Sequence, residues 1–441
     1  MKIVASLWSS SSKVKKLSKN GVNVNAHAAN RAILVAPMRI AMIGQKGFEI
    51  GERGGGIEQH VRALATHLGR RGHEVTVYAR RRYAPVATVS TPDSRRSAGY
   101  PGVIVRYVPT VYRKNFEAIV HTFLCTFDAL LRDYDVIHYH GVGPSTLAWI
   151  PRLLKPKARV VCTFHSQDRF HQKWGLFARL YLWFGEWACC QFPHATIAVS
   201  HVIQVYARKH YGCQIVYIPN GAEVQTVTAT DRVVALGLEP GRYVLNVGRL
   251  APHKGVQYLI EGWKSLGEGV GWEENYKNQD PNAHFKLVIV GAAGYGSEYE
   301  KSLRDAAVGH EDIRFLGYQS GEALRQLYAH AYLFVQPSES EGLPVVVLEA
   351  MSFGCPVLVS DIPENLEAMS PMGNSGCREQ HVGFSFRNKD ASDLAERLGQ
   401  LLHHPEVVDD AAAKTQRIIA EHFNWNMIAV HTEAVYLSIR H

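Results

Sequence analysis

The sequence predicts an α/β protein made of two doubly wound, Rossmann-like halves, each a parallel sheet with helices packed on its faces. Short apolar runs alternate with helical stretches, and the alternation pauses at Asn220-Gly221 and resumes at Tyr243. The runs are apolar at successive positions, which is typical of parallel strands buried on both faces. The length of 441 residues also exceeds what one ordinary core fills.

The first half begins with an apolar strand, Arg39–Gly44, that ends in glycine. A helix follows, because Ile57, Val61, Leu64 and Leu68 recur at the spacing of one helical face. Further strands of this half are predicted at Glu74–Tyr78, Val103–Val108, Val136–His140, Val160–His165, Thr196–Ser200 and Ile215–Pro219.

The second half repeats the pattern. Its strands are predicted at Tyr243–Gly248, Phe285–Gly291, Ile313–Gly317, Tyr332–Gln336, Pro356–Ser360 and Gly383–Phe386. The polar and acidic segment Gly267–His284 indicates a surface insertion, and the chain should be helical from about Glu406. Ligands of such folds bind at the carboxyl ends of the strands, so we expect the site in the cleft between the halves.

We divide the chain into four parts. Residues 1–37, rich in Ser, Lys and Asn, form a flexible basic extension. Residues 38–222 form an N-terminal Rossmann-like domain, and residues 223–425 form a C-terminal Rossmann-like domain. Residues 426–441 form a helix that we expect to pack back on the N-terminal domain.

Charge is distributed unevenly along the chain. Residues 1–230 carry 30 Lys and Arg against 12 Asp and Glu, a net +18, whereas residues 231–441 carry 18 against 28, a net −10. We expect the first half to approach an anionic membrane surface or a phosphorylated acceptor. Nucleic acid is the weaker interpretation, because the basic residues are dispersed and no nucleic-acid-binding motif occurs. The sequence has no uncharged apolar run of membrane-spanning length, and the seven scattered cysteines should be reduced thiols.

The strongest functional signal is the segment Ser338-Glu339-Ser340-Glu341-Gly342-Leu343-Pro344, which joins a predicted strand to a predicted helix. Pro344 suits the first helical position. No Ser, Thr, Asp or Asn directly precedes it, so the first amides of the helix should stay uncapped and available to a phosphate.

Glu349 lies on the apolar face of this helix, among Val345, Val346 and Phe353. A buried carboxylate requires a polar partner. Ribose hydroxyls are our candidate, and a backbone group or a core lysine is the alternative. Glu341 and Glu349 should lie roughly 8–12 Å apart, which matches a sugar at one end of a diphosphate and a ribose at the other.

Two cations, Arg249 after Gly248 and Lys254 a turn later, follow the first strand of the second half. They suit a diphosphate leaving group, and two solvated loop cations are the alternative. In the first half, glycines at Gly44-Gln45-Lys46-Gly47 and Gly54-Gly55-Gly56-Ile57-Glu58 follow the first strand. NAD is disfavoured there, because no G-x-G-x-x-G follows this strand and no acidic residue ends the second one.

His165 ends a strand and should lie in the cleft, although a core histidine without a role is the alternative. Two apparent metal motifs are rejected. Asp133-Tyr134-Asp135 precedes a strand, at the end opposite the ligand. His138 and His140 share one face of a strand, but we expect no third ligand near them and therefore no zinc. No metal site is predicted.

The stretch from Ser338 through Glu341-Gly342-Leu343-Pro344 to Glu349 resembles the signature of group 1 retaining glycosyltransferases with the GT-B fold, and the resemblance extends from Met38 to near the C-terminus. It implies that Arg249 and Lys254 bind the donor diphosphate, although His253 stands where a glutamate commonly precedes the lysine. It also implies that residues 38–222 form the acceptor-side domain and residues 223–425 the donor-binding domain. The glycine-rich loop would lie beside the donor phosphates and the acceptor, and His165 would contact the donor sugar.

The segment from His165 to Arg169, together with Lys173, resembles bacterial enzymes that assemble cell-surface polysaccharides. The expected catalytic residues are His165, Arg249, Lys254 and Glu341. The expected donor-binding residues are Gly55, Gly56, Gly248, Ser338, Gly342, Leu343, Pro344 and Glu349. The expected acceptor-side residues are Glu58, Asp168, Arg169 and Lys173.

We therefore expect a retaining, metal-independent glycosyltransferase of the hexosyltransferase type, without a cofactor. It should move a sugar from a nucleoside-diphosphate sugar, a UDP-sugar by family frequency, to a hydroxyl of a glycan or lipid-linked acceptor. Exopolysaccharide, lipopolysaccharide or capsule assembly is the expected role, in the cytoplasm or peripherally at the inner face of the plasma membrane. The alternatives are a sugar-nucleotide epimerase or hydrolase of the same fold, a non-catalytic nucleotide-sugar-binding protein and, more remotely, a Rossmann oxidoreductase.

Overall fold

The computed structural model describes residues 36–48, 51, 54–83, 94–96, 99–113, 116–167, 169, 175–268, 285–293, 297–371 and 381–439. The predicted N-terminal extension and the predicted insertion at Gly267–His284 lie almost entirely outside the described residues. Asp168, Lys173 and Cys377 also lie outside them.

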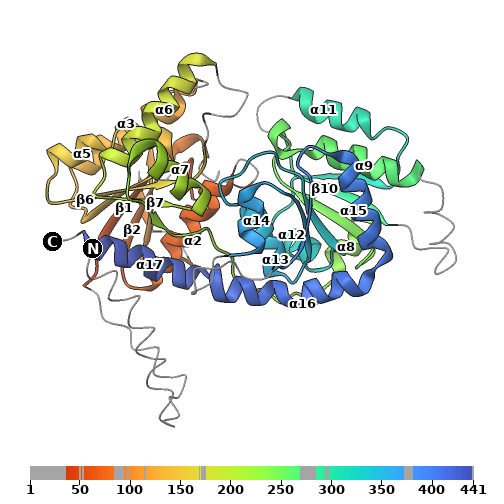
Figure 1. The fold of residues 1–441 in the computed structure, drawn as a ribbon. Coiled ribbons are helices and arrows are strands. Elements are labelled where there is room, and N and C mark those ends of the chain that lie inside the picture. Colours follow the sequence, from red (N-terminus) through yellow and green to blue (C-terminus); the bar gives the residue numbers. More distant parts are fainter. Residues whose placement is uncertain are drawn as a thin grey trace, which may run out of the picture.

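An eight-stranded sheet forms the N-terminal half of the molecule, on the left of Figure 1. Its order is β3-β4-β2-β1-β5-β6-β7-β8, and the neighbours run parallel except β3, which pairs antiparallel with β4 at the edge. The strands are β1 (Arg39–Ile43), β2 (Glu74–Arg80), β3 (Ser94–Arg96), β4 (Val103–Val108), β5 (Val136–His140), β6 (Arg159–Phe164), β7 (Ala195–Ala198) and β8 (Val216–Tyr217).

Helices of this half lie on both sides of the sheet, with α2 below and α3, α5 and α6 above it in Figure 1. The helices are α2 (Gly56–Arg70), α3 (Glu117–Leu130), α4 (Val142–Ser145), α5 (Trp149–Leu154), α6 (Leu176–Gln191) and α7 (His201–Tyr211), with a short 3-10 turn at Arg81–Tyr83. Val61, Leu64 and Leu68 of α2 are buried, as their spacing predicted.

A six-stranded, fully parallel sheet in the order β11-β10-β9-β12-β13-β14 forms the C-terminal half. Its strands are β9 (Tyr243–Val247), β10 (Lys286–Val290), β11 (Ile313–Gly317), β12 (Leu333–Gln336), β13 (Val357–Ser360) and β14 (Phe384–Phe386). Its helices are α8 (Asp231–Ala235), α9 (Val256–Glu268), α11 (Ser297–Ala306), α12 (Gly321–Ala329), α13 (Val345–Ser352), α14 (Pro363–Met369) and α15 (Ala391–His403). The predicted pair of doubly wound parallel sheets is confirmed.

The last two helices connect the halves along one side of the molecule (Figure 1). α16 (Pro405–His422) packs on α13, and α17 (Trp425–Ser438) packs on α2. Glu433 of α17 accepts a hydrogen bond from Arg71 Nε at 3.0 Å and lies 2.8 Å from His73 Nε2. Tyr436 places its hydroxyl 2.7 Å from His138 Nδ1. The C-terminal helix therefore belongs to the core of the N-terminal half.

Two further hydrogen bonds join the halves. The Glu367 carboxylate of α14 accepts from the backbone N–H of His201 at 2.8 Å, and the N–H of Ala222 donates to the Phe423 carbonyl at 2.8 Å. Within the described part of the chain, no helix combines the length and the apolar character needed to cross a bilayer.

Candidate active site

The carboxyl ends of β9 and β12 bring together the first group of predicted residues. Lys254 ends a 3-10 turn, Pro252–Lys254, that follows β9, and Glu341 lies in the loop between β12 and α13. Gly255 allows these loops to touch, because its φ is +71° and a Cβ atom there would lie 1.8 Å from the Pro337 carbonyl oxygen. Lys254 Nζ thereby reaches Glu341 Oε1 at 2.7 Å.

Glu341 is fixed through one of its two oxygens. Lys254, Ser338 Oγ (2.6 Å) and Gln336 Nε2 (2.8 Å) all donate to Oε1. Burial opposes ionisation, but the Lys254 charge and these hydrogen bonds hold the pKa of Glu341 below its ordinary value. The carboxylate is therefore ionised at neutral pH. Among the described residues nothing donates to Oε2, which leaves this oxygen for a ligand hydroxyl.

Gln336 is a site residue that sequence reasoning missed. It ends the apolar strand β12, is buried, and donates to both Ser338 Oγ (2.5 Å) and Glu341. A lone amide at the carboxyl end of an apolar strand was the available signal.

The helix after Glu341 begins one residue later than predicted. α13 starts at Val345, and Pro344 is its N-cap rather than its first helical residue, because its ψ of 103° keeps it extended. No side chain caps this helix. Its first amides are therefore available to an anion.

A second uncapped helix start lies beside the first. α2 begins at Gly56, after an extended Gly55 that provides no side-chain cap. A Cβ atom on Gly56 would lie 3.7 Å from Val345 Cγ2, so the starts of α2 and α13 meet across the two halves. Two positive helix ends at one place favour a multiply charged anion such as a diphosphate.

The two halves lie in close contact at Gly342. A Cβ atom there would lie 1.8 Å from the His165 carbonyl oxygen, so a side chain does not fit. The next residue, Leu343, accepts a hydrogen bond through its carbonyl from Asn220 Nδ2 at 2.8 Å. The structure thus brings His165 of the N-terminal half against the Glu341-Gly342-Leu343 loop.

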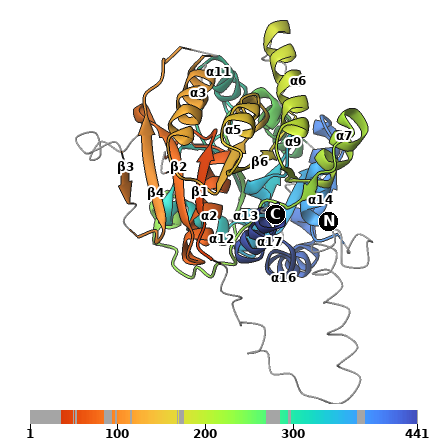
Figure 2. The ribbon, with the colours of Figure 1, turned by 90° about the vertical axis from the view of Figure 1, so that its left-hand side faces the viewer.

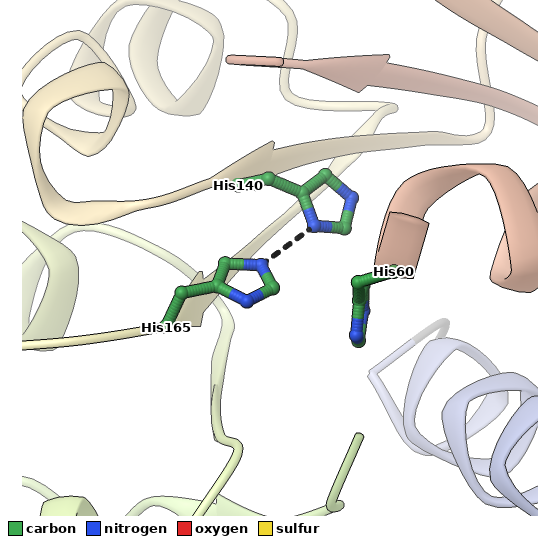
Figure 3. Close-up of side chains that lie close together, drawn as sticks. All are labelled: His60, His140 and His165. Carbon is green, nitrogen blue, oxygen red and sulfur yellow. Dashed lines mark hydrogen bonds between the residues drawn. The ribbon is translucent and has the colours of Figure 1, made fainter. Parts of the chain in front are cut away.

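The side chains of His60, His140 and His165 are buried next to this contact and lie close together (Figure 3). His165 Nε2 is 3.2 Å from His140 Nδ1, and the His60 ring packs edge-to-face on His165 with the centroids 4.7 Å apart. His60 Nδ1 also lies 2.9 Å from Asn220 Oδ1. Burial lowers the pKa of His60 to about 4 and the pKa of His165 well below its ordinary value. The imidazoles of His60 and His165 are therefore uncharged at neutral pH.

One step of the argument against a metal at His138 and His140 was wrong. The two rings share a face of β5, with their centroids 4.1 Å apart. However, one ring nitrogen from each of His60, His140 and His165 lies within 4.8 Å of the others. The imidazoles of His60 and His165 do lie near His140, because α2 brings His60, and the end of β6 brings His165, to the end of β5.

Arg249 lies near enough to a cation of the other half to affect the pKa of that cation. It is exposed on the loop after β9, and its charge, together with the larger effect of burial, lowers the pKa of Lys46. Lys46 lies in the glycine-rich loop after β1, and its backbone N–H donates to Glu58 Oε1 at 3.0 Å. Sequence reasoning did not select Lys46, although its place after the first strand was a signal. Two cations that interact across the two halves suit a diphosphate.

Glu349 lies half-buried on α13. The Tyr328 hydroxyl donates to its Oε2 at 3.3 Å, and the Tyr328 ring stacks on Phe353 with the centroids 5.6 Å apart. Burial raises the pKa of Glu349 to about 7, against smaller opposing effects of Tyr328 and Arg62. Its partner in this structure is thus a tyrosine, and its contact with a ribose stays a prediction.

The remaining candidates occupy different places. Arg169 points inward, because its Nε lies 3.2 Å from Oε2 of the buried Glu186 and its guanidinium also donates to Tyr206. Glu58 supports the glycine-rich loop. The rejected Asp133-Tyr134-Asp135 motif lies at the amino end of β5, where Asp135 accepts from the Arg39 N–H at 2.8 Å.

Two family models match consecutive parts of the chain. "Glycosyl transferases group 1" matches residues 230–418, and "Glycosyltransferase Family 4" matches residues 54–226. The first range contains Arg249, Lys254 and Glu341. The second contains the start of α2 and His165.

Curated relatives match over most of the chain. The phosphatidyl-myo-inositol mannosyltransferase of Mycobacterium leprae is 26% identical over 407 residues, which cover 91% of this chain and 97% of that protein. The D-inositol 3-phosphate glycosyltransferase of Nocardia farcinica is 27% identical over 403 residues, which cover 83% and 82%.

Solved structures share the fold. Sucrose-phosphate synthase from Thermosynechococcus elongatus has a TM-score of 0.71 at 22% identity, covering 91% of this chain and 99% of that one. Anabaena HepE in complex with UDP-glucose has a TM-score of 0.67 at 18% identity, covering 91% and 100%. With both sheets, both family models and these relatives in agreement, the chain belongs to the group 1 glycosyltransferases and has the GT-B fold.

Proposed function

We propose that the protein transfers a sugar from a nucleoside-diphosphate sugar to an acceptor hydroxyl and retains the anomeric configuration. The observation that carries this proposal is the state of Glu341. Its carboxylate is ionised and held by three donors on Oε1, while Oε2 accepts no hydrogen bond from the described residues. A carboxylate fixed in this way can orient a sugar hydroxyl without moving itself.

The diphosphate is proposed to bind where the two helix starts meet. The amides at the beginning of α13, the start of α2 and the cations Arg249 and Lys46 would surround it. Lys254 is paired with Glu341 and would share its charge between that carboxylate and the donor. These groups stabilise the negative charge that develops as the diphosphate leaves, so we propose that no metal ion and no cofactor is required.

In the proposed step the bond between the anomeric carbon and the diphosphate oxygen breaks. A bond from the same carbon to the acceptor oxygen forms on the same face, and the acceptor proton passes to the departing phosphate. The chain supplies orientation and electrostatics rather than a nucleophile. His165, uncharged and in contact with Gly342, would border the sugar, and contact between the halves would exclude water.

The relatives guide the choice of substrates. HepE binds UDP-glucose, which supports a UDP-sugar, while the mycobacterial relatives are named as mannosyltransferases, which brings mannosyl donors into consideration. The phosphatidyl-myo-inositol in the name of one relative supports a lipid-linked acceptor. We propose a role in exopolysaccharide, lipopolysaccharide or capsule assembly, at the cytoplasmic face of the plasma membrane.

A donor screen tests the proposal. Because a ligand that binds the native state raises the melting temperature, UDP-, GDP-, ADP- and dTDP-sugars should be ranked by thermal stabilisation. The stabilising donor should then yield a product whose anomeric configuration, read by NMR, matches the donor, with and without EDTA. Glu341→Ala and Lys254→Ala should each lose most turnover while staying folded, and full activity in both would refute the site.

The same screen separates the alternatives. An epimerase or hydrolase would convert the donor at full rate without any acceptor, whereas a transferase should do so slowly. A non-catalytic binding protein would be stabilised by a donor but would turn over none across a broad acceptor panel.

A further inference from the structure

An apolar helix face lies uncovered on α6. Its exposed side chains, which we call the α6 surface, are Leu176, Phe177, Leu180, Trp183, Phe184 and Trp187. They recur at the spacing of one helical face, and Phe177 and Leu176 are 87% and 71% exposed. The opposite face of α6 is also apolar and buries Leu182 and Cys189 against the N-terminal half. A helix that is apolar on both sides is expected to be covered on both sides.

The packing of α6 holds this face outward. Gly185 lies so close to Val142 that a Cβ atom would be 2.5 Å from the Val142 carbonyl oxygen. Glu186 is buried and accepts hydrogen bonds from Tyr206 (2.9 Å) and Tyr211 (2.6 Å). Turning the helix to hide the α6 surface would break these contacts, so the surface is a fixed feature of the fold.

Neighbouring helices add exposed apolar groups. α3 exposes Phe123 and Phe127, whose ring centroids are 4.6 Å apart, and α5 exposes Leu153 and Leu154. Figures 1 and 2 both show α3, α5 and α6 on the same side of the N-terminal sheet. The uncovered area therefore extends beyond one helix.

The charged residues near these exposed apolar side chains indicate which kind of partner covers them. Arg179 is exposed on the flank of the α6 surface, whereas Glu186, the single acidic residue of α6, is buried and paired with Arg169. On α3, Asp128 is paired with Arg106 and with Arg132. The first 230 residues carry a net +18. Aromatic and leucine side chains beside an exposed arginine, on a half of the chain with net basic charge, are the chemistry of an anionic bilayer interface.

We propose that the α6 surface docks on an anionic lipid bilayer. Phe177, Leu180 and Trp183 insert at the level of the headgroups, and Arg179 stays among the lipid phosphates. α6 follows β6 and His165 in the chain, so the docking helix belongs to the same half as the acceptor side of the site. Docking is independent of the reaction; delivery of a lipid-linked acceptor from the bilayer rests on the proposed function.

Vesicle sedimentation with the full-length protein tests the proposal. The wild type should bind vesicles that contain phosphatidylglycerol at low salt and bind pure phosphatidylcholine vesicles far more weakly. The double variant Phe177→Ser/Leu180→Ser should lose at least tenfold in vesicle affinity, and Arg179→Glu should lose affinity for the anionic vesicles. Val308→Ser, which changes a 76% exposed valine of the other half, is the matched control and should bind as the wild type.

Other outcomes would overturn the proposal. Wild-type protein that stays in solution with anionic vesicles at low salt contradicts it, as does undiminished binding by the double variant. A dimer in solution that dissociates in the double variant, without vesicle binding, would make the α6 surface a protein interface. Melting temperatures check that these exposed substitutions leave the fold intact. Donor turnover with a water-soluble acceptor is measured in parallel, so that failure of docking and failure of the proposed reaction are told apart.

Discussion

Replacing Gly342 by alanine should force the two halves apart at the active site. The added Cβ atom would lie 1.8 Å from the His165 carbonyl oxygen, where a carbon contact requires about 3.5 Å. The loop must therefore move by about 1.7 Å, and a misplacement of about 1 Å costs on the order of 10²-fold in rate. We expect kcat to fall at least ~10²-fold, which corresponds to about 3 kcal/mol of transition-state stabilisation.

The assay compares initial rates of sugar transfer, with the donor that the thermal screen identifies, for the wild type, Gly342→Ala and Gly143→Ala. Gly143 is the control because a Cβ atom there would meet nothing within 4 Å. Gly342 is buried at this contact, so the melting temperature of Gly342→Ala is measured in parallel and the rates are compared at a temperature at which the variant stays folded. A variant with wild-type kcat and KM would show that catalysis does not use this contact between the halves, and the reasoning would fail.

Three further predictions concern the same region. Lys254→Met removes the charge that lowers the pKa of Glu341, so the acid limb of the kcat/KM profile should move to higher pH; an unmoved limb would show that Glu341 does not control it. Glu349 has a folded pKa of about 7 against 4.5 for the ordinary group, so the folded state binds more protons between these values and stability should fall as pH rises through this window. Glu349→Gln should reduce the difference in the free energy of unfolding between pH 5 and pH 8 by on the order of 1–3 kcal/mol, measured by urea unfolding. If the wild type and the variant show the same difference, Glu349 is not its cause. Asn220→Ala removes the partner of the Leu343 carbonyl and of His60, and should cost about 1–3 kcal/mol in urea unfolding; unchanged stability would show that this bridge between the halves contributes nothing.

The strands were predictable because parallel strands buried on both faces are apolar at successive positions. Thirteen of the observed strands coincide with predicted ones to within two residues at every end. The exception is β3, Ser94–Arg96, which is short and polar and pairs antiparallel at the sheet edge. The spacing of apolar residues therefore does not indicate this strand. Pro344 was placed one residue too far into α13, because the residue at a helix boundary depends on ψ, which sequence does not give.

The residues of the candidate site also fall into two groups, those that a local sequence motif identifies and those that only the fold brings together. Residues that follow strands in local motifs, such as Lys254 and Glu341, were predictable, and the structure places them in contact. Residues that act through distant partners were not. Asn220 meets both Leu343 and His60 only because the two halves pack together. The cluster of His60, His140 and His165 likewise depends on strand order, which brings α2 and β6 to the end of β5.

The central claim is that a diphosphate binds at the start of α13 and is contacted there by Arg249 and Lys254. A crystal structure of the protein with UDP tests it most directly. The account predicts phosphate oxygens within hydrogen-bonding distance of the first amides of α13, with Arg249 and Lys254 both turned toward them. A nucleotide bound elsewhere, or phosphates that contact none of these groups, would contradict it.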